Sequence, residues 1–224
     1  MSATNLELFS DIGLRAREFI LSTYNNLPNT IFVTALLMGA IQGNLSMIWI
    51  AIGMIINALC VLSLQELLPL IFPKWDQVNQ PSSRACSLID DPLGPALTVV
   101  APSYWFASTT YFVVFILYNA AQVAFKPAAA GVSKKKVDTR VAFTMSVMIL
   151  SLFFLLIIML RGLTGCETWL GSILGVTVGS TVAILYWQLL DVCHSGIAPD
   201  ILNVVTALAP AKSGEDTTPV LCTA

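Results

Sequence analysis

Few side chains in this sequence combine reactive chemistry with a position that suits a site. Pro102 and Ser103 stand where a long polar loop gives way to an apolar run, and a Pro-Ser pair that opens a membrane helix is typical of a site. Tyr104 and Trp105 follow directly, and the indole N–H of Trp105 does not ionise. Arg161 ends a later apolar run, and Glu167 stands six residues after it. That spacing allows an internal ion pair, which would neutralise both charges.

The cysteines and the single histidine do not form a metal-binding pattern. The chain contains no CxxC pair, and its five cysteines are scattered: Cys60, Cys86, Cys166, Cys193 and Cys222. His194 has no ligand spacing around it, so we expect neither a zinc site nor any other metal or cofactor. Cys86 and Cys166 fall in loops that we place on one side of a membrane, which leaves a disulfide between them open.

The composition indicates a membrane protein. Of the 224 residues, 56% are apolar and only 11% are charged, whereas soluble domains carry about a quarter charged residues. Several stretches reach the length of about 20 apolar residues that a bilayer core demands. The formal net charge of −2 gives no reason to expect nucleic acid as a partner. We therefore predict an all-α, multi-pass transmembrane bundle.

The expected helices follow from the apolar runs and from the breaks between them. Residues 4–22 have the spacing of an amphipathic helix that lies at the membrane interface or packs on the protein's own loops. The predicted helices cover residues 29–42, 45–72, 103–125, 138–160 and 168–190, with a tight turn at "QGN" (42–44). These give five spans, or six if the N-terminal helix also crosses. The predicted regions are an N-terminal segment (1–28), the bundle (29–190) and a C-terminal tail (191–224).

Charge placement predicts the orientation of the bundle. The loop 126–138 is the most basic segment and is expected on the cytosolic side, with Asp138 as the N-cap of the helix that follows. The loop 73–102 and the junction around Arg161 then share the opposite face. Segments that are far apart in the sequence would therefore meet at one end of the bundle.

The last predicted helix carries Gly171, Gly175 and Gly179 on one face. Small residues spaced four apart allow helix backbones to approach closely within lipid. Helix packing is therefore the expected role of all three.

These features, in this order, resemble the type 2 phosphatidate phosphatase superfamily, which includes lipid-phosphate and dolichyl-diphosphate phosphatases. That family has three signatures, K-x6-R-P, P-S-G-H and S-R-x5-H-x3-D, at helix ends on one membrane face. This chain has "PSYW" (102–105) in the place of the second and "LRGLTGCETWLG" (160–171) in the place of the third. The stretch "GSILGVTVG" is similar to the family's glycine-rich last helix. The resemblance covers residues 50 to 190.

The resemblance implies a site that has lost its catalytic groups. Trp105 stands where the family has the acid histidine, Glu167 where it has the nucleophilic histidine, and Gly171 where it has the orienting aspartate. An indole N–H does not ionise and cannot serve as that proton donor. The phosphate-holding positions that remain are Ser103, Arg161 and, with a weaker match, Lys74, whose neighbour Arg84 is out of register. We therefore expect no enzymatic activity.

The expected function is structural, and other readings stay open. The lead hypothesis is a membrane protein that anchors a bilayer to a protein assembly, such as a minor capsid protein in the internal membrane of a large DNA virus. Its partners would be lipid and other membrane or capsid proteins, bound through the 73–102 loop, the basic loop or the tails. The alternatives are a rebuilt lipid-phosphate phosphatase, in which Ser103 would need Glu167 as its base, and a lipid-phosphate binder that uses Arg161 and Lys74. An unrelated helical bundle also fits the apolar pattern.

Overall fold

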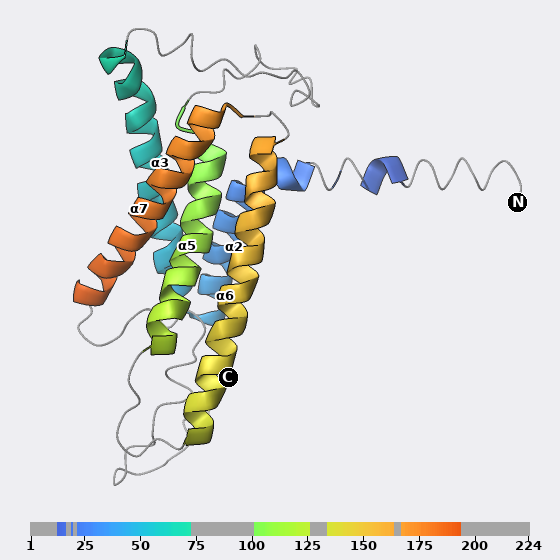
Figure 1. Ribbon diagram of the computed structural model, residues 1–224, viewed down its shortest axis with the longest axis vertical. Helices are drawn as coiled ribbons and strands as arrows, with labels where there is room; N and C mark the ends of the chain where they lie inside the picture. Colours follow the sequence, from blue (N-terminus) through green and yellow to red (C-terminus); the bar gives the residue numbers. More distant parts are fainter. Residues whose placement is uncertain are drawn as a thin grey trace, which may run out of the picture.

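The described part of the chain is a bundle of α-helices. The computed structural model describes residues 13–16, 19, 22–72, 101–125, 134–163 and 167–193. The helices are α2 (Leu27–Gln42), α3 (Leu45–Ile71), α5 (Tyr104–Phe125), α6 (Lys134–Leu163) and α7 (Trp169–Cys193). They run side by side along the long axis of the molecule (Figure 1). The predicted all-α class is confirmed for these residues.

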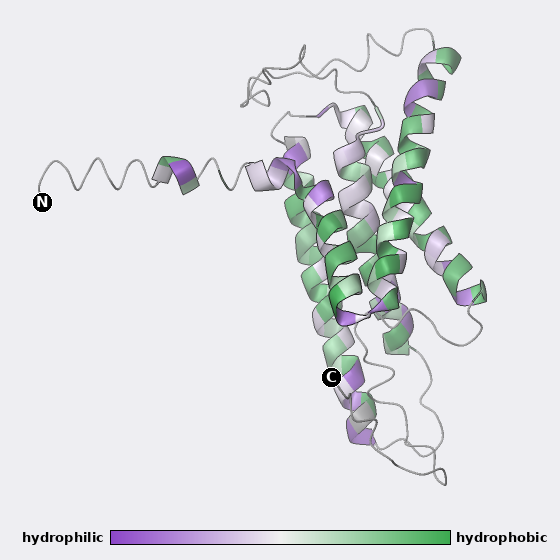
Figure 2. Cartoon of the chain, turned by 180° about the vertical axis from the view of Figure 1, so that it is seen from behind, coloured by the Kyte–Doolittle hydropathy of each residue, from purple (hydrophilic) through white to green (hydrophobic). Residues whose placement is uncertain are grey.

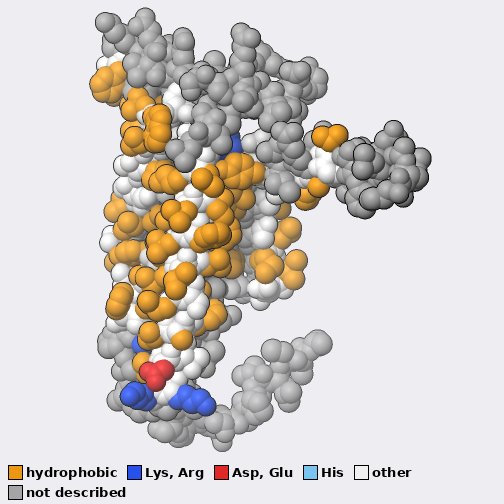
Figure 3. Space-filling model, turned by 45° about the vertical axis from the view of Figure 1, so that its right-hand side comes forward, with side chains coloured by type: hydrophobic (Ala, Val, Ile, Leu, Met, Phe, Trp, Pro, Cys, Tyr) orange, Lys and Arg blue, Asp and Glu red, His pale blue; other side chains and the backbone are white. Residues whose placement is uncertain are grey.

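Four of these helices, α3, α5, α6 and α7, are long and apolar enough to cross a bilayer. Length and composition thus indicate an integral membrane protein. Hydrophobic residues fill the middle of the helices (Figure 2), and apolar side chains cover the outer face seen in Figure 3. The helix α2 has 16 residues, which corresponds to about 24 Å and falls short of the roughly 30 Å of a hydrocarbon core.

The helix α5 is the centre of the bundle. It packs against α2, α3, α6 and α7, and its side chains from Trp105 to Tyr111 are all buried. One apolar cluster joins α5 to α3 and α7 through Tyr111, Phe115 and their neighbours. A second joins α5 to α6 through Phe106 and Ile158. Because α5 is enclosed on most sides, its ends fix where the other helices meet.

The turn between α2 and α3 lies where the sequence predicts it. Gly43 follows α2 with a φ of 64°, a left-handed conformation that glycine adopts at little cost. The Asn44 side chain then caps α3 by accepting a hydrogen bond from the Ser46 backbone N–H at 3.0 Å. The "QGN" stretch therefore connects two antiparallel helices, as predicted.

The helix α7 approaches α5 through its glycines. A Cβ added at Gly175 would lie 2.7 Å from the Ser103 carbonyl oxygen. A Cβ added at Gly179 would overlap the carbonyl group of Ala107. Only residues without a side chain allow the two backbones to come this close. This close contact fixes the position of α7 along its axis relative to the start of α5.

One predicted helix start is wrong. The helix α6 begins at Lys134 rather than at residue 138, so Asp138 lies inside the helix and is not its N-cap. The helices α6 and α7 also end three residues beyond their predicted bounds of 160 and 190, at Leu163 and Cys193. The helix α6 starts before the apolar stretch because lysine also favours helix. An apolar run marks the part of a helix that lies in hydrocarbon, and the helix itself can extend beyond it.

Several expectations lie outside the described residues. They concern the loop 73–100, most of the basic loop, the tail beyond Cys193, and much of the N-terminal helix. Lys74, Arg84, Cys86, Cys166 and His194 belong to these segments.

Candidate functional site

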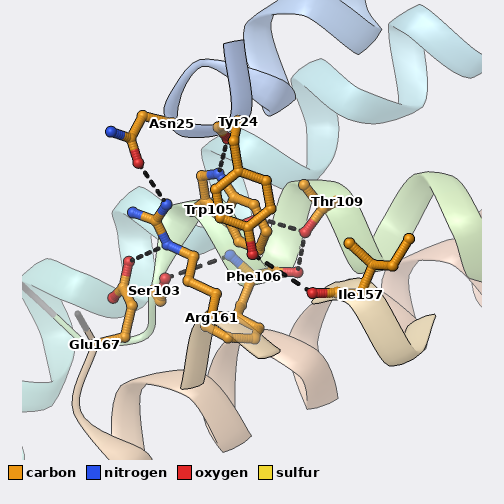
Figure 4. Close-up of polar contacts among 9 residues, drawn as sticks. All are labelled: Tyr24, Asn25, Ser103, Trp105, Phe106, Thr109, Ile157, Arg161 and Glu167. Atoms are coloured by element: carbon orange, nitrogen blue, oxygen red, sulfur yellow. Dashed lines mark hydrogen bonds and ion pairs between the residues drawn. The ribbon is translucent and has the colours of Figure 1, made fainter. Parts of the chain in front are cut away.

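Side chains from four segments of the chain meet at one end of the bundle. Ser103 and Trp105 come from the start of α5, Arg161 comes from the end of α6, and Glu167 precedes α7. Tyr24 and Asn25 come from the residues just before α2. Figure 4 shows these side chains converging on the guanidinium group of Arg161. The predicted convergence of distant segments is confirmed for α5, α6 and the junction before α7.

Backbone contacts position Ser103 at the start of α5. Its N–H donates to the Gly171 carbonyl at 3.0 Å, and its hydroxyl oxygen accepts from the Phe106 N–H at 3.3 Å, as an N-cap does. The preceding carbonyl, that of Pro102, accepts a hydrogen bond from the Gln65 side chain at 2.8 Å. The start of α5 is therefore tied to both α7 and α3.

The start of α7 is built in a similar way and places Glu167. The Thr168 hydroxyl accepts from the Gly171 N–H at 3.0 Å, while its carbonyl accepts from the Ser172 N–H at 2.9 Å. Thr168 is thus the N-cap of α7, and Glu167 stands immediately outside the helix. A Cβ at Gly171 would lie 2.8 Å from the Thr168 hydroxyl. Gly171 therefore serves the cap of α7.

Arg161 is surrounded by groups of its own chain. Its guanidinium carbon lies 4.5 Å from the centroid of the Trp105 ring and 5.8 Å from that of the Tyr24 ring. Its Nη1 donates to the Asn25 side-chain oxygen at 2.9 Å. Its Nε lies 3.5 Å from Oε1 of Glu167, which is the ion pair that the spacing predicted. Two aromatic rings, an amide and a carboxylate therefore share one cation (Figure 4).

Trp105 and Tyr24 hold the segment before α2 against the bundle. The indole N–H of Trp105 donates to the Tyr24 carbonyl at 3.0 Å, and the two ring centroids lie 5.1 Å apart. The Tyr24 hydroxyl donates to the carbonyl of Ile157, in α6, at 3.4 Å. The single indole N–H of Trp105 is thus used in a structural contact.

Burial dominates the electrostatics of the carboxylate. It raises the pKa of Glu167 above the ordinary value of 4.5, against the opposing effects of the Arg161 charge and of hydrogen bonds from Ser103 and Arg161. Burial likewise raises the pKa of Tyr24, again against the Arg161 charge. The free-energy cost of removing the carboxylate from water is therefore larger than the stabilisation that its partners provide. Proton uptake by Glu167 is correspondingly easier than in water.

This arrangement offers limited chemistry. Ser103 lowers the pKa of the Glu167 carboxyl, so the two side chains lie near each other, as the nucleophile and base of a rebuilt phosphatase would need to. Ser103, however, is only 2% exposed. Within the described parts of the chain, no group of three or more His, Cys, Asp or Glu side chains is placed to hold a metal ion.

The structure brings together most of the residues that the sequence singled out. Ser103, Trp105, Arg161, Glu167 and Gly171 lie at one site, and Gly175 and Gly179 lie in the α5–α7 contact. Lys74 is outside the described residues.

Sequence reasoning missed Tyr24, Asn25 and Gln65. Asn25 belongs to the stretch "NNLP" (25–28), which lies between the predicted N-terminal helix (4–22) and the predicted helix 29–42. Asparagine is common directly before a helix, and Gln65 lies within an apolar helix, so neither residue gives a specific signal for a site.

Comparison with family models, with curated proteins and with solved structures gave no match.

Proposed function

We propose that this chain is a non-catalytic integral membrane protein with a structural role, built on a phosphatidate-phosphatase-like bundle. In this proposal α2 is a fifth, short span, and the N-terminal segment is either a sixth span or an interfacial helix. The observation that carries the proposal is the surroundings of Arg161. The residue that would hold a substrate phosphate is engaged by Glu167, Asn25 and Trp105.

The contacts of Arg161 support a structural rather than a substrate-binding role. Each of them joins α6 to a different segment. Trp105 belongs to α5, Glu167 lies just before α7, and Asn25 lies just before α2. A phosphate at Arg161 would have to compete with the carboxylate that is already paired with the guanidinium, and it would be repelled by that carboxylate. We name this set, Tyr24, Asn25, Trp105, Arg161 and Glu167, the arginine clasp.

The proposed structural role is to anchor a bilayer to a protein assembly, such as the capsid around an internal viral membrane. The 73–102 loop, the basic loop and the tails would bind the partner. At the end opposite the arginine clasp, the exposed side chains of Lys134 and Lys135 begin α6, and Figure 3 shows this charged end below the apolar face. A charged helix end beyond the apolar span suits contact with a partner outside the bilayer.

Phosphate release by the purified, full-length protein in detergent tests this proposal. Phosphatidate and a polyprenyl diphosphate are the substrates, and Arg161→Ala and Ser103→Ala are the comparison variants. We expect no release above the background of protein-free detergent with either substrate. Release that Arg161→Ala or Ser103→Ala abolishes would overturn the proposal.

One observation favours a second candidate, a lipid-phosphate phosphatase with a rebuilt site. Ser103 lowers the pKa of the Glu167 carboxyl, and Arg161 lies 3.5 Å from that carboxylate. The three side chains could supply a nucleophile, a base and a phosphate-binding cation. This candidate requires loss of activity in Ser103→Ala and also in Glu167→Gln, because the serine would lose its base. The same assay separates the two candidates, since the structural proposal predicts no activity for the parent.

A further inference from the structure

Three polar groups lie deep between α3, α5 and α7. Asn57 and Tyr111 have no exposed surface, and Tyr186 is 7% exposed. Asn57 lies 12 residues after the start of α3, which is about 18 Å along the helix axis. Both tyrosines belong to the apolar cluster around Phe115. The arginine clasp plays no part in this region.

These groups have hydrogen-bonding atoms that the described residues do not satisfy. The Asn57 side-chain oxygen and the hydroxyls of Tyr111 and Tyr186 are buried and have no partner among the described residues. The Asn57 amide nitrogen donates to the Ser108 hydroxyl at a long 3.5 Å. A buried polar group without a partner is costly, and lipid offers no water to compensate. Three such atoms in one helix contact therefore require an explanation.

Gly53 brings the two tyrosines to the same place. A Cβ at Gly53 would overlap the Tyr111 hydroxyl and would lie 2.6 Å from Cε1 of Tyr186. The side chains of α5 and α7 thus converge on the backbone of α3 at this glycine. Asn57 follows Gly53 by four residues and so lies on the same face of α3, one turn further along. One turn beyond Gly53, the hydrogen bond from Asn57 to Ser108 joins α3 to α5.

We propose that Asn57, Tyr111 and Tyr186 form a buried water-binding site in the middle of the bundle. The inventory of donors and acceptors suits water. Each tyrosine hydroxyl donates one hydrogen bond, and the Asn57 oxygen accepts. A buried water typically makes about three hydrogen bonds to polar groups that would otherwise be unsatisfied. Water bound here links α3, α5 and α7, and Gly53 provides the close approach that the site needs.

Hydroxyl-radical footprinting by X-ray radiolysis, read by mass spectrometry, tests the site in the full-length protein in detergent. Radicals formed from a bound water label the side chains next to it even where bulk solvent does not reach. Phe115 is the internal control, because it is aromatic and has no exposed surface. The centroids of the Phe115 and Tyr111 rings lie 5.9 Å apart. We expect Tyr111 and Tyr186 to be labelled several-fold faster than Phe115. Labelling of both tyrosines at or below the rate of Phe115 would overturn the proposal.

The variant Asn57→Leu tests whether the water is held as described. Leucine has a similar size and no hydrogen-bonding atom, so labelling of Tyr111 and Tyr186 should fall toward that of Phe115. Unchanged labelling would overturn the assignment to Asn57. If this variant does not fold, Tyr111→Phe replaces it, because only the hydroxyl is lost. We expect Tyr111→Phe to raise the unfolding equilibrium constant roughly fivefold, as loss of one hydrogen bond does. A lowered constant would instead mean that the hydroxyl had no partner, and would overturn the proposal.

Discussion

The guanidinium carbon of Arg161 lies 4.5 Å from the centroid of the Trp105 ring. A cation within about 6 Å of an indole face is attracted by the ring quadrupole. The contact joins the end of α6 to the start of α5, and the indole N–H on the same ring binds the Tyr24 carbonyl. Trp105 therefore contributes two contacts that hold the start of α5 against α6 and against the segment before α2.

The first prediction concerns Trp105 itself. Trp105→Leu should lower the free energy of unfolding by about 1–3 kcal/mol, because one cation–π contact and one buried hydrogen bond are lost together. Denaturant titration of the purified protein, followed by far-UV circular dichroism, measures this change. The matched control is Trp169→Leu, at a tryptophan that is 67% exposed, and it should change stability little. Equal effects of the two substitutions would contradict the role assigned to Trp105.

The second prediction is a pH dependence that comes from Glu167. Burial raises the pKa of this carboxyl in the folded protein above its ordinary value of 4.5, so the folded state binds the proton more tightly than the unfolded state. Its stabilising contribution is complete below pH 4.5 and is lost as the pH rises through the folded pKa. On acidification from neutral pH, the parent should therefore gain stability relative to Glu167→Gln, which cannot titrate.

Melting temperatures of the parent and Glu167→Gln, measured between pH 7 and pH 4, check this sign. All other titrating groups are common to both proteins and cancel in the difference. A parent that loses stability relative to Glu167→Gln on acidification would mean that the ion pair with Arg161 outweighs burial.

The third prediction concerns the approach of α7 to α5. Gly179→Ala should lower the free energy of unfolding by about 1–3 kcal/mol, since the added methyl group would overlap the Ala107 carbonyl and force the helices apart. Gly162→Ala is the control, because its nearest new neighbour would lie 3.7 Å away, at an ordinary contact distance. Thermal unfolding in one detergent compares the two variants. Helix propensity favours alanine over glycine at both positions, so a Gly162→Ala variant that is as destabilised as Gly179→Ala would contradict the packing argument.

The sequence predicts the helices well where a physical requirement repeats along the chain. The bilayer demands long apolar runs, so α3, α5 and α7 appear within three residues of their predicted ends. It demands nothing of the polar ends, and the start of α6 was therefore placed at Asp138 instead of Lys134. The turn at Gly43 was predictable because glycine, followed by a capping asparagine, leaves few alternatives.

The candidate site was predictable only in part. The six-residue spacing of Arg161 and Glu167 indicated the ion pair, because both residues belong to one short junction. The partners Tyr24 and Asn25 are 136 or more residues away from Arg161 in the sequence. Long-range contacts of this kind depend on how α2 packs beside α5, and a single sequence carries no signal for that packing.

Whether Arg161 stabilises the fold or binds a substrate decides between the structural proposal and the enzymatic one. The decisive measurement follows unfolding and phosphate release on the same preparations of the parent, Arg161→Ala and the control Lys134→Ala, which alters an exposed lysine at the other end of α6. We predict no phosphate release by any of them, with an unfolding midpoint lowered in Arg161→Ala alone. Release by the parent that Arg161→Ala abolishes without any change in the unfolding midpoint would contradict the account.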